Sequence, residues 1–346
     1  MIYSPNTDNG EGMDFKKVIY DLEAEYLSPY ACKSADTKGR LHPITPCELR
    51  TDFQRDRDRI IHSKSFRRLK HKTQVFLAPE GDHYRTRLTH TLEVSQIARG
   101  IARALRLNED LTEAIALGHD LGHTPFGHAG ERALARKMSD EGGFRHCKQS
   151  LRVVDVLEND GKGLNLTYEV RDGIVNHTRH GHPSTLEGRV VCLSDQIAYL
   201  NHDVDDAIRG GVISERDLPE NVVKLFGDSH GKRIDSMIMD IIRHSYGKPF
   251  VDPSERAAAV MEEFRDFMFA RVYSSPLAKS EEPKVEYMIS LLFDRFLAHP
   301  EQLPEYIRKS DASDKQKVCD HIATMSDTYL VRVFEDTFIP KGWAKL

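Results

Sequence analysis

One short stretch of this 346-residue chain constrains its fold and chemistry more than any other: residues 118–131, which read GHDLGHTPFGHAGE. The stretch holds three histidines and two carboxylates, a density of titratable side chains that packing alone rarely requires. Pro125 is expected to end a helix, and the chain then turns before a second helix. Mixed nitrogen and oxygen ligands beside an acid/base histidine indicate a site for a hard divalent cation.

A predicted helix over 109–122 would carry the first part of this stretch. His119 and His123 are four residues apart, so that helix would place both on one face. His128 and Glu131 follow the turn and are expected to return towards the same point from a new direction. The stretch therefore predicts a compact cluster of imidazoles and carboxylates.

A second segment supplies another candidate ligand, His90. It recurs with Val94, Ile97 and Ile101 at helical spacing, which places the imidazole on the inward stripe of an amphipathic helix. Burying a polar ring there is costly unless the ring has a partner. We therefore interpret His90 as a metal ligand.

A third segment, 194–203, divides its side chains between two helix faces. Asp195, Tyr199, His202 and Asp203 share one face, and apolar residues share the other. Three helices are thus expected to bring together one set of metal ligands: His90, His119, Asp120 and Asp195.

Composition and charge limit the class of protein. Charged residues make up 30% and hydrophobic residues 39%, which is ordinary for a globular chain, and no apolar run approaches the roughly 18 residues of a membrane span. The acidic, non-apolar N-terminus predicts no secretory signal, so we expect a cytoplasmic protein with no membrane partner. Five scattered cysteines, with no Cys-x-x-Cys pair, indicate neither a disulfide framework nor structural zinc.

The net charge of −5 conceals a local basic run. Residues 55–72 carry eight Arg or Lys against two Asp, a formal +6, and Arg85 and Arg87 follow. A solvated helix face would account for such a run, but its proximity to His90 favours a substrate with several phosphates.

Apolar periodicity predicts an all-α chain. Expected helices span 52–71, 88–106, 109–122, 129–138, 147–159, 166–177, 185–209, 255–273, 283–297 and 315–338. The best extended candidate is 72–77, and the loop-rich connection 210–253 is where we place any domain boundary.

Several other motifs are absent or uninformative. A Gly-x-x-x-x-Gly over 122–127 lacks the following Lys-Ser/Thr of a phosphate loop, and neither Gly-x-Ser-x-Gly nor His-Glu-x-x-His occurs. His177, His180 and His182 precede Pro183, and we interpret them as a polar loop, not as metal ligands.

The order of a His, a later His-Asp pair and a distant Asp resembles the HD-domain phosphohydrolases, and longer pieces narrow the match to the deoxyguanosinetriphosphate triphosphohydrolase family. These pieces are Asp56 to Val75, Tyr84 to His90, His119 to Glu131, Gly143 to His146, Gly163 to Thr167, Asp195 to Asp206 and Asp320 to Asp327. The resemblance runs from about residue 25 to 340. It implies an all-α HD fold with a helical C-terminal extension.

The resemblance also implies a domain organisation. Residues 1–50 would form a partly irregular N-terminal segment, 51–210 the HD metal-dependent phosphohydrolase core, and 211–346 a helical region that completes the pocket and supplies a subunit interface. A homo-oligomer, tetramer or hexamer, follows from the family, with allosteric dNTP or single-stranded DNA as further partners.

The implied reaction is hydrolysis of a deoxynucleoside triphosphate, dGTP being favoured, to a deoxynucleoside and inorganic triphosphate. A divalent ion, Mn²⁺ or Mg²⁺ with iron, cobalt and nickel as alternatives, would activate the water that attacks the α-phosphorus. His128, oriented by Glu131, is the expected acid or base. His123 and His146 are expected to line the pocket, where they contact phosphate or relay protons.

The substrate contacts are carried over in the same way. Arg87 would hold the α-phosphate, and Lys72 would lie near the sugar or phosphates. Gln74 and Asp203 would bind the 3′-hydroxyl, Val75 would pack beneath the ribose, and Tyr199 would contact phosphate or sugar. For Gln74 and Val75, a strand end in the core is the competing interpretation.

The chain departs from the family pattern around His146, where Arg145 and Cys147 replace the usual Glu and Asn, and at Ser194, which replaces an Ala. These neighbours would set the orientation and pKa of His146. Two alternatives stay open: another HD enzyme, such as a nucleoside monophosphate phosphatase or guanosine tetraphosphate hydrolase, and a nucleotide-sensing HD protein of low activity.

Overall fold

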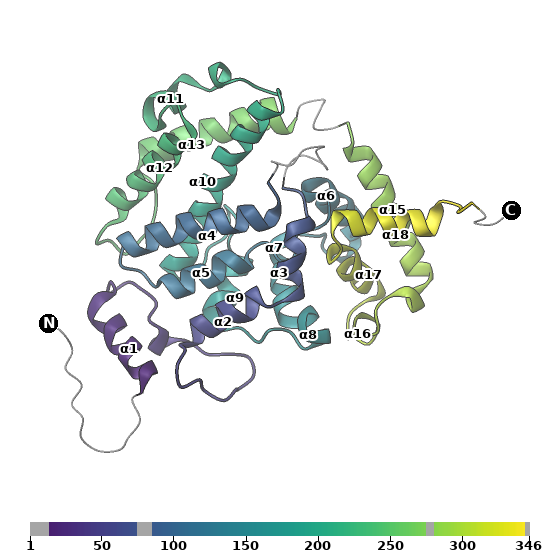
Figure 1. Ribbon diagram of the computed structural model, residues 1–346, viewed down its shortest axis with the longest axis horizontal. Helices are drawn as coiled ribbons and strands as arrows, with labels where there is room; N and C mark the ends of the chain where they lie inside the picture. Colours follow the sequence, from purple (N-terminus) through teal and green to yellow (C-terminus); the bar gives the residue numbers. More distant parts are fainter. Residues whose placement is uncertain (1–13, 75–84, 275–279, 343–346) are drawn as a thin grey trace.

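The protein is described by a computed structural model that covers residues 14–74, 85–274 and 280–342 (Figure 1). Across these ranges the chain forms helices and no strand, and the extended pairings are single bridges, Arg40 with Thr167 and Thr73 with Thr86. The prediction of an all-α fold is confirmed. None of the helices in these ranges has the length and apolar character needed to cross a membrane.

The longer helices follow the predicted order. They are α1 (Phe15–Tyr26), α2 (Asp52–Ile61), α3 (Lys64–Arg68), α4 (Arg87–Ala104), α5 (Glu109–Gly118), α6 (Gly127–Lys137), α7 (His146–Arg152), α9 (Tyr168–Val175), α10 (Leu186–Arg209), α11 (Glu220–Phe226), α12 (His230–Ser245), α13 (Glu255–Met268), α15 (Glu282–Ala298), α17 (Asp314–Ala323) and α18 (Asp327–Phe338). Shorter elements are α8 (Glu158–Gly161), α16 (Glu305–Arg308), 3₁₀ turns η1 (Ser34–Asp36), η2 (Leu69–His71), η3 (Ser139–Glu141), η5 (Glu215–Asp217) and η7 (Pro300–Gln302), and π-helical turns η4 (Val153–Leu157) and η6 (Phe269–Tyr273).

Side-chain caps fix where the helices that carry the site begin. The Thr86 side chain accepts a hydrogen bond from the backbone N–H of Thr89, and the Thr89 side chain accepts one from the backbone N–H of Thr86. Helix α4 therefore starts with a capping box immediately before Arg87. Thr51 and Gln54 form the same arrangement at the start of α2.

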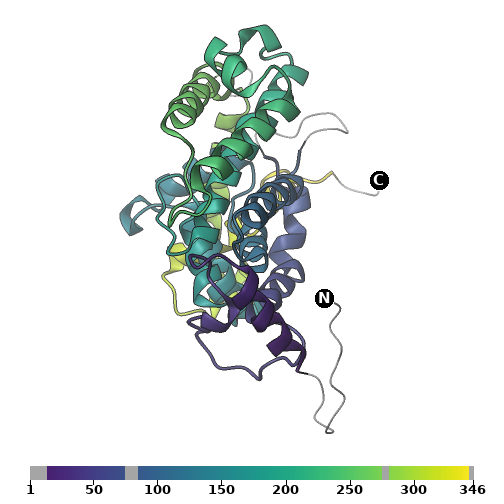
Figure 2. The same ribbon diagram turned by 90° about the vertical axis from the view of Figure 1, so that its left-hand side faces the viewer.

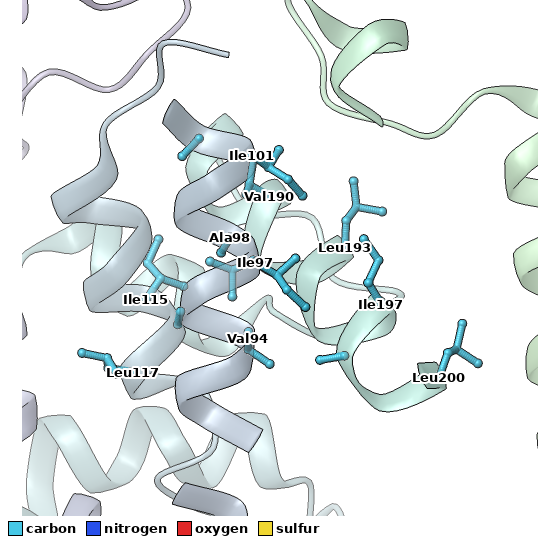
Figure 3. Packing of buried hydrophobic residues seen from close by; sticks show 14 of the residues in the cluster. Val94, Ile97, Ala98, Ile101, Ile115, Leu117, Val190, Leu193, Ile197 and Leu200 are labelled. Atoms are coloured by element: carbon cyan, nitrogen blue, oxygen red, sulfur yellow. The ribbon is translucent and has the colours of Figure 1, made fainter. Parts of the chain in front are cut away.

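The central helices α4, α5 and α10 pack around one apolar core (Figure 3). Ile97 and Ile101 of α4 face Val190, Leu193 and Ile197 of α10, and all are buried. Full burial of each such side chain stabilises the fold by about 1.5–3 kcal/mol relative to exposure. This packing fixes the relative positions of His90 on α4 and Asp195 on α10.

The same core extends through α11, α12 and α13; α12 and α13 pack against α10, and α11 packs against α12 and α13 (Figures 1 and 2). A second apolar cluster joins α6 to α15, α17 and α18. The C-terminal helices therefore pack directly against α6, the helix that follows the His-rich turn. The division into domains at 50 and 210 stays a prediction.

Predicted helices are interrupted at several points, and the one expected over 147–159 divides into α7, η4 and α8. The helix expected over 52–71 breaks at Ser63, whose side chain caps α3, and the one over 315–338 breaks between α17 and α18. The helix expected over 109–122 ends at Gly118, so the prediction that His119 and His123 share a helix face is wrong. The chain leaves the helix to pass close to α7, where a Cβ on Gly122 would lie 2.1 Å from the Ser150 nitrogen.

Candidate active site

The proposed metal ligands come from α4, from the chain directly after α5 and from α10, and they lie close together. His90 Nε2 lies 3.1 Å from Asp195 Oδ1, and His119 Nε2 lies 4.0 Å from the same oxygen. One donor atom from each of these three residues falls within 4.8 Å of the others. The structure thus brings together His90, His119 and Asp195, as the sequence predicts.

The orientation of His119 suits it to bind a cation. Its Nδ1 donates to the carbonyl oxygen of Ala116 at 2.6 Å, so Nε2 carries the lone pair. Among the described residues, this buried Nε2 has no hydrogen-bond partner. An imidazole fixed through Nδ1 with a bare Nε2 is the usual arrangement of a metal-ligating histidine, and the donor set fits a divalent ion.

Asp120 divides its carboxylate between two neighbours. Oδ1 lies 3.7 Å from His119 Nε2, and Oδ2 accepts a hydrogen bond from Arg87 at 2.6 Å. Burial alone would raise the pKa of Asp120, but the charges of Arg87 and the nearby histidines outweigh it and hold that pKa well below its usual value. The carboxylate is therefore an anion, with one oxygen available to a metal.

Asp195 and His90 reinforce one another's charge. Burial opposes ionisation of Asp195, yet the hydrogen bond from His90 and the neighbouring imidazoles lower the pKa of Asp195 to about 2. Burial likewise disfavours the cationic form of His90, but the Asp195 partner raises the pKa of His90. A pocket that stabilises an anion and a positive partner at one point is suited to hold a cation.

Six imidazoles form a continuous row that leads away from this centre. Successive ring centroids are 5.7, 5.0, 5.2, 4.7 and 5.8 Å apart along His90, His119, His177, His146, His123 and His128. His123 and His146 stack with an interplanar angle of 20°. The row connects the metal ligands to the predicted acid/base residues.

His177 is a member of this row that the sequence interpretation missed, since it assigned His177 to a polar loop. The side chain is buried, and its Nε2 lies 3.3 Å from that of His146. Its Nδ1 donates to the carbonyl oxygen of Ile174, three residues back, at 2.7 Å. His119 follows the end of α5 in the same way, so a histidine placed just after an apolar helix was the available signal.

Glu131 serves two of the predicted catalytic histidines. Its carboxylate accepts from His146 Nδ1 at 3.1 Å and from the His146 backbone at 2.9 Å, and it lies 3.7 Å from His128 Nδ1. Burial would raise the pKa of Glu131, but its interactions with His128 and His146 lower that pKa strongly. For His146, the Glu131 pair outweighs burial and raises the pKa of the imidazole.

His128 is the solvent-facing end of the row, with 69% of its side chain exposed. The turn before it requires glycine at 127, where φ is +55° and a Cβ would lie 3.2 Å from the Gln74 carbonyl oxygen. His123 beside it is buried, and burial together with the charge of Arg87 lowers the pKa of His123 well below its usual value. His123 is therefore neutral.

Asp203 lies further along α10 and is also buried. It accepts a hydrogen bond from the hydroxyl of Tyr273, at the end of the helix expected over 255–273. Burial outweighs this hydrogen bond and raises the pKa of Asp203 to about 7. A carboxyl that is partly protonated near neutrality can both donate and accept a hydrogen bond.

Tyr199 lines a cavity of about 190 Å³ between α10 and α13. Three arginines also line it, and each has an acidic neighbour: Arg179 and Arg265 contact Glu262, and Arg189 lies 2.5 Å from Asp252. Sequence reasoning did not identify these cations. They lie far apart in the chain, and the packing of α13 on α10 brings them together.

The remaining predicted substrate residues are Lys72, Gln74 and Val75, and the first two lie beside the His-rich turn over 123–128. Gln74 accepts from Arg87 through its backbone oxygen at 3.4 Å, and its side-chain Oε1 is buried with no partner in the described part of the chain. Lys72 is buried and donates to the carbonyl oxygens of His123 and Ala323. Val75 lies outside the described residues.

Several side chains of the basic run over 55–72 form ion pairs or hydrogen bonds within the protein. Arg57 pairs with Asp110 and Glu113, and Arg59 donates to a backbone carbonyl. Burial lowers the pKa of Lys72 to about 7. The cavity beside Tyr199 gathers three further cations, which are likewise paired with carboxylates.

Comparisons with known proteins agree with this architecture. The HD domain profile matches residues 87–200, and that of the phosphohydrolase-associated domain matches 251–336. A deoxyguanosinetriphosphate triphosphohydrolase-like protein of Caldanaerobacter subterraneus subsp. tengcongensis is 56% identical over 333 residues, covering 96% of this chain and 98% of that protein. Another so named, from Desulfatibacillum aliphaticivorans, is 48% identical and covers 95% and 99%.

The fold is also shared with a solved phosphohydrolase from Bacteroides thetaiotaomicron, which superposes with a TM-score of 0.50 at 15% identity over 81% of this chain and 68% of that one. The relatives at 56% and 48% identity make the family assignment plain, and His90, His119 and Asp195 lie together in this fold. The chain belongs to the deoxyguanosinetriphosphate triphosphohydrolase-like family of HD-domain proteins and is a metal-dependent phosphohydrolase.

Proposed function

We propose that this protein hydrolyses deoxynucleoside triphosphates to a deoxynucleoside and inorganic triphosphate, and that dGTP is the preferred substrate. One observation carries the proposal. Asp195, in the metal cluster, and Tyr199, in the wall of the arginine-lined cavity, lie one turn apart on α10. A ligand with one phosphate at the metal cluster can thus extend further phosphates towards Arg179, Arg189 and Arg265.

His90, His119, Asp120 and Asp195 would hold the metal ion in this proposal. When bound, a divalent ion there supplies Lewis acidity and lowers the pKa of a coordinated water. Arg87 keeps Asp120 ionised, and its remaining donors are directed to the α-phosphate. Mn²⁺ and Mg²⁺ suit the mixed donor set, with iron, cobalt and nickel as alternatives.

His128 acts as the acid that protonates the departing 5′-oxygen of the deoxynucleoside. Its ring is exposed to solvent, and its Nδ1 lies 3.7 Å from the Glu131 carboxylate, which would orient it. His146 shares Glu131, while the neutral His123 stacks on His146 and meets the His128 ring edge to face. His123 and His146 therefore provide the wall against which the phosphate and His128 are oriented.

Asp203 and Gln74 recognise the 3′-hydroxyl of the sugar. Asp203 is held by Tyr273, and the unpaired Gln74 Oε1 supplies an acceptor. Val75 beneath the ribose is part of the proposal from family resemblance alone. The contact of Lys72 with substrate, the homo-oligomeric state and activation by dNTP or single-stranded DNA stay predictions.

The two alternative enzymes, a nucleoside monophosphate phosphatase and a guanosine tetraphosphate hydrolase, would use the same proposed metal ligands but release different products. Chromatography of reactions with Mn²⁺ and each dNTP, singly and mixed, tests the proposal. Deoxynucleoside and triphosphate in equal amounts are expected. Release of inorganic phosphate or pyrophosphate would contradict the proposal. Turnover that occurs only in the dNTP mixture would show that one nucleotide activates hydrolysis of another.

A further inference from the structure

The segment from Asp320 to Asp327, which joins α17 to α18, touches the catalytic region at three points. Asp320 is buried and binds Arg152 and Gln149 of α7, the helix that begins at His146. The carbonyl oxygen of Ala323 accepts from Lys72 at 2.8 Å. All these contacts join the C-terminal helices to the elements that carry the histidine row.

Asp327 makes the most direct contact. Its Oδ1 accepts from the backbone N–H of Phe126 at 2.9 Å, and its Oδ2 accepts from the backbone N–H of Thr73 at 2.9 Å and from the Thr73 hydroxyl. Phe126 lies between His123 and His128 in the sequence, and Thr73 precedes Gln74. One buried carboxylate therefore ties the acid/base turn to the segment proposed to bind the sugar.

The backbone of Phe126 explains why such a tie is needed. Its φ of +59° and ψ of +29° place a bulky residue in the left-handed region, a strained conformation that persists only where the surroundings hold it. The Phe126 ring is buried in the apolar cluster of α15, α17 and α18. Both the ring and the N–H of this strained residue are thus held by the C-terminal helices.

Lys72 supports the same turn from the other side. Its buried amino group donates to the carbonyl oxygen of His123 as well as to that of Ala323. The His-rich turn is consequently fixed by one carboxylate and one amino group. Neither group belongs to the metal ligands.

We propose that Asp327 is a positioning residue, which sets the placement of His123 and His128 relative to Gln74 through Phe126 and Thr73. The phosphohydrolase-associated part of the chain is thereby a component of the active site. This inference rests on the proposed function for its kinetic readout. Misplacing a catalytic group by about 1 Å can slow chemistry roughly a hundredfold.

A purely local role for Asp327 is the competing explanation, since it is the first residue of α18 and its charge favours the helix N-terminus. Asp314 is a matched control. It is the first residue of α17, follows a capping serine in the same way, and has 80% of its side chain exposed. Asp327→Asn and Asp314→Asn therefore make the same change at equivalent helix positions.

The kinetic test compares these variants on the substrate that the wild type hydrolyses. Asp327→Asn should lower kcat roughly ten- to a hundredfold, with KM and Mn²⁺ affinity within about twofold of wild type, while Asp314→Asn leaves kcat unchanged. Unchanged kcat in Asp327→Asn, or equal losses in both variants, would overturn the inference. If Asp327→Asn does not fold, Asp327→Glu keeps the charge but displaces the carboxylate, and should also lower kcat.

A second readout does not depend on turnover. Hydrogen exchange measured by mass spectrometry should be faster over residues 123–128 in Asp327→Asn than in wild type, and unchanged in Asp314→Asn. Equal protection in all three proteins would refute the contact. If the wild type hydrolyses no dNTP, the proposed function fails, and exchange together with Mn²⁺-dependent hydrolysis of bis(4-nitrophenyl) phosphate still decides the role of Asp327.

Discussion

Asp195 and Tyr199 lie one helical turn apart on α10 and belong to two different environments. Asp195 contacts His90 among the proposed metal ligands, whereas Tyr199 lines a cavity that Arg265 also lines. A rise of about 1.5 Å per residue separates the two positions by about 6 Å along the helix, which is comparable to the reach of a short phosphate chain. This relationship makes a polyphosphate a better fit than a monophosphate.

Removing one cavity cation should weaken binding of the outer phosphates. Arg265→Ala is expected to raise KM for a dNTP about tenfold or more, because a charge-assisted hydrogen bond contributes about 1.5–3 kcal/mol. Initial-rate kinetics would measure the effect. Arg271→Ala is the control, since Arg271 lies on η6 with 59% of its side chain exposed and pairs with Asp217; equal effects of the two substitutions would argue against a phosphate site in the cavity.

Removing a proposed metal ligand should abolish both metal binding and turnover. His119→Ala deletes a buried Nε2 whose orientation is set by Ala116. Calorimetric titration with Mn²⁺ should show no binding, while the far-ultraviolet circular dichroism spectrum stays close to that of wild type. Retained turnover with full Mn²⁺ affinity would contradict the assignment of His119.

His128 should affect chemistry more than binding. His128→Ala is expected to slow kcat by roughly a hundredfold or more and to leave Mn²⁺ and nucleotide affinity intact, because the ring is largely exposed. His180→Ala provides a control at an exposed histidine outside the row. A loss confined to nucleotide affinity would mean that His128 binds substrate and does not transfer protons.

Glu187, which is not one of the proposed metal ligands, should make the stability of the fold depend on pH. Its Oε1 accepts from the backbones of Cys32 and Asn108, its buried Oε2 has no partner in the part of the chain that the structure describes, and burial raises the pKa of Glu187 to about 7. Between its ordinary value of 4.5 and about 7, the folded state keeps a proton that the unfolded state has released. The free energy of unfolding therefore falls as pH rises through this window.

Glu187→Gln should remove that dependence, because the amide stays neutral. From pH 4.5 to 7.5, urea denaturation should show the stability of the variant improving relative to wild type by on the order of 3 kcal/mol. Glu220→Gln, at an exposed first-turn position of α11, should run parallel to wild type. A parallel curve for Glu187→Gln would show that Glu187 titrates normally.

Helical periodicity predicted the inward placement of His90 and the faces of α10, because both depend on local spacing. It failed after Gly118, where the backbone departs from the helix to meet α7. Spacing could not have predicted that departure. The partner of Gly122 is Ser150, and the close contact exists only in the folded chain.

The contacts that hold the His-rich turn in place could not be predicted from the sequence either. Asp327 and Phe126 are 201 residues apart, and Lys72 and Ala323 are 251 apart. The family resemblance singled out the segment that contains Asp327 without giving it a role. His177 was missed because its polar neighbours suggested a loop, although its Nδ1 caps the end of α9.

The most direct test of the proposed reaction is hydrolysis of dGTP with Mn²⁺ in water enriched in ¹⁸O, followed by mass spectrometry of both products. Attack of water on the α-phosphorus breaks the bond to the 5′-oxygen, so one ¹⁸O should appear in inorganic triphosphate and none in deoxyguanosine. Label in deoxyguanosine, or products other than deoxyguanosine and triphosphate, would contradict the account.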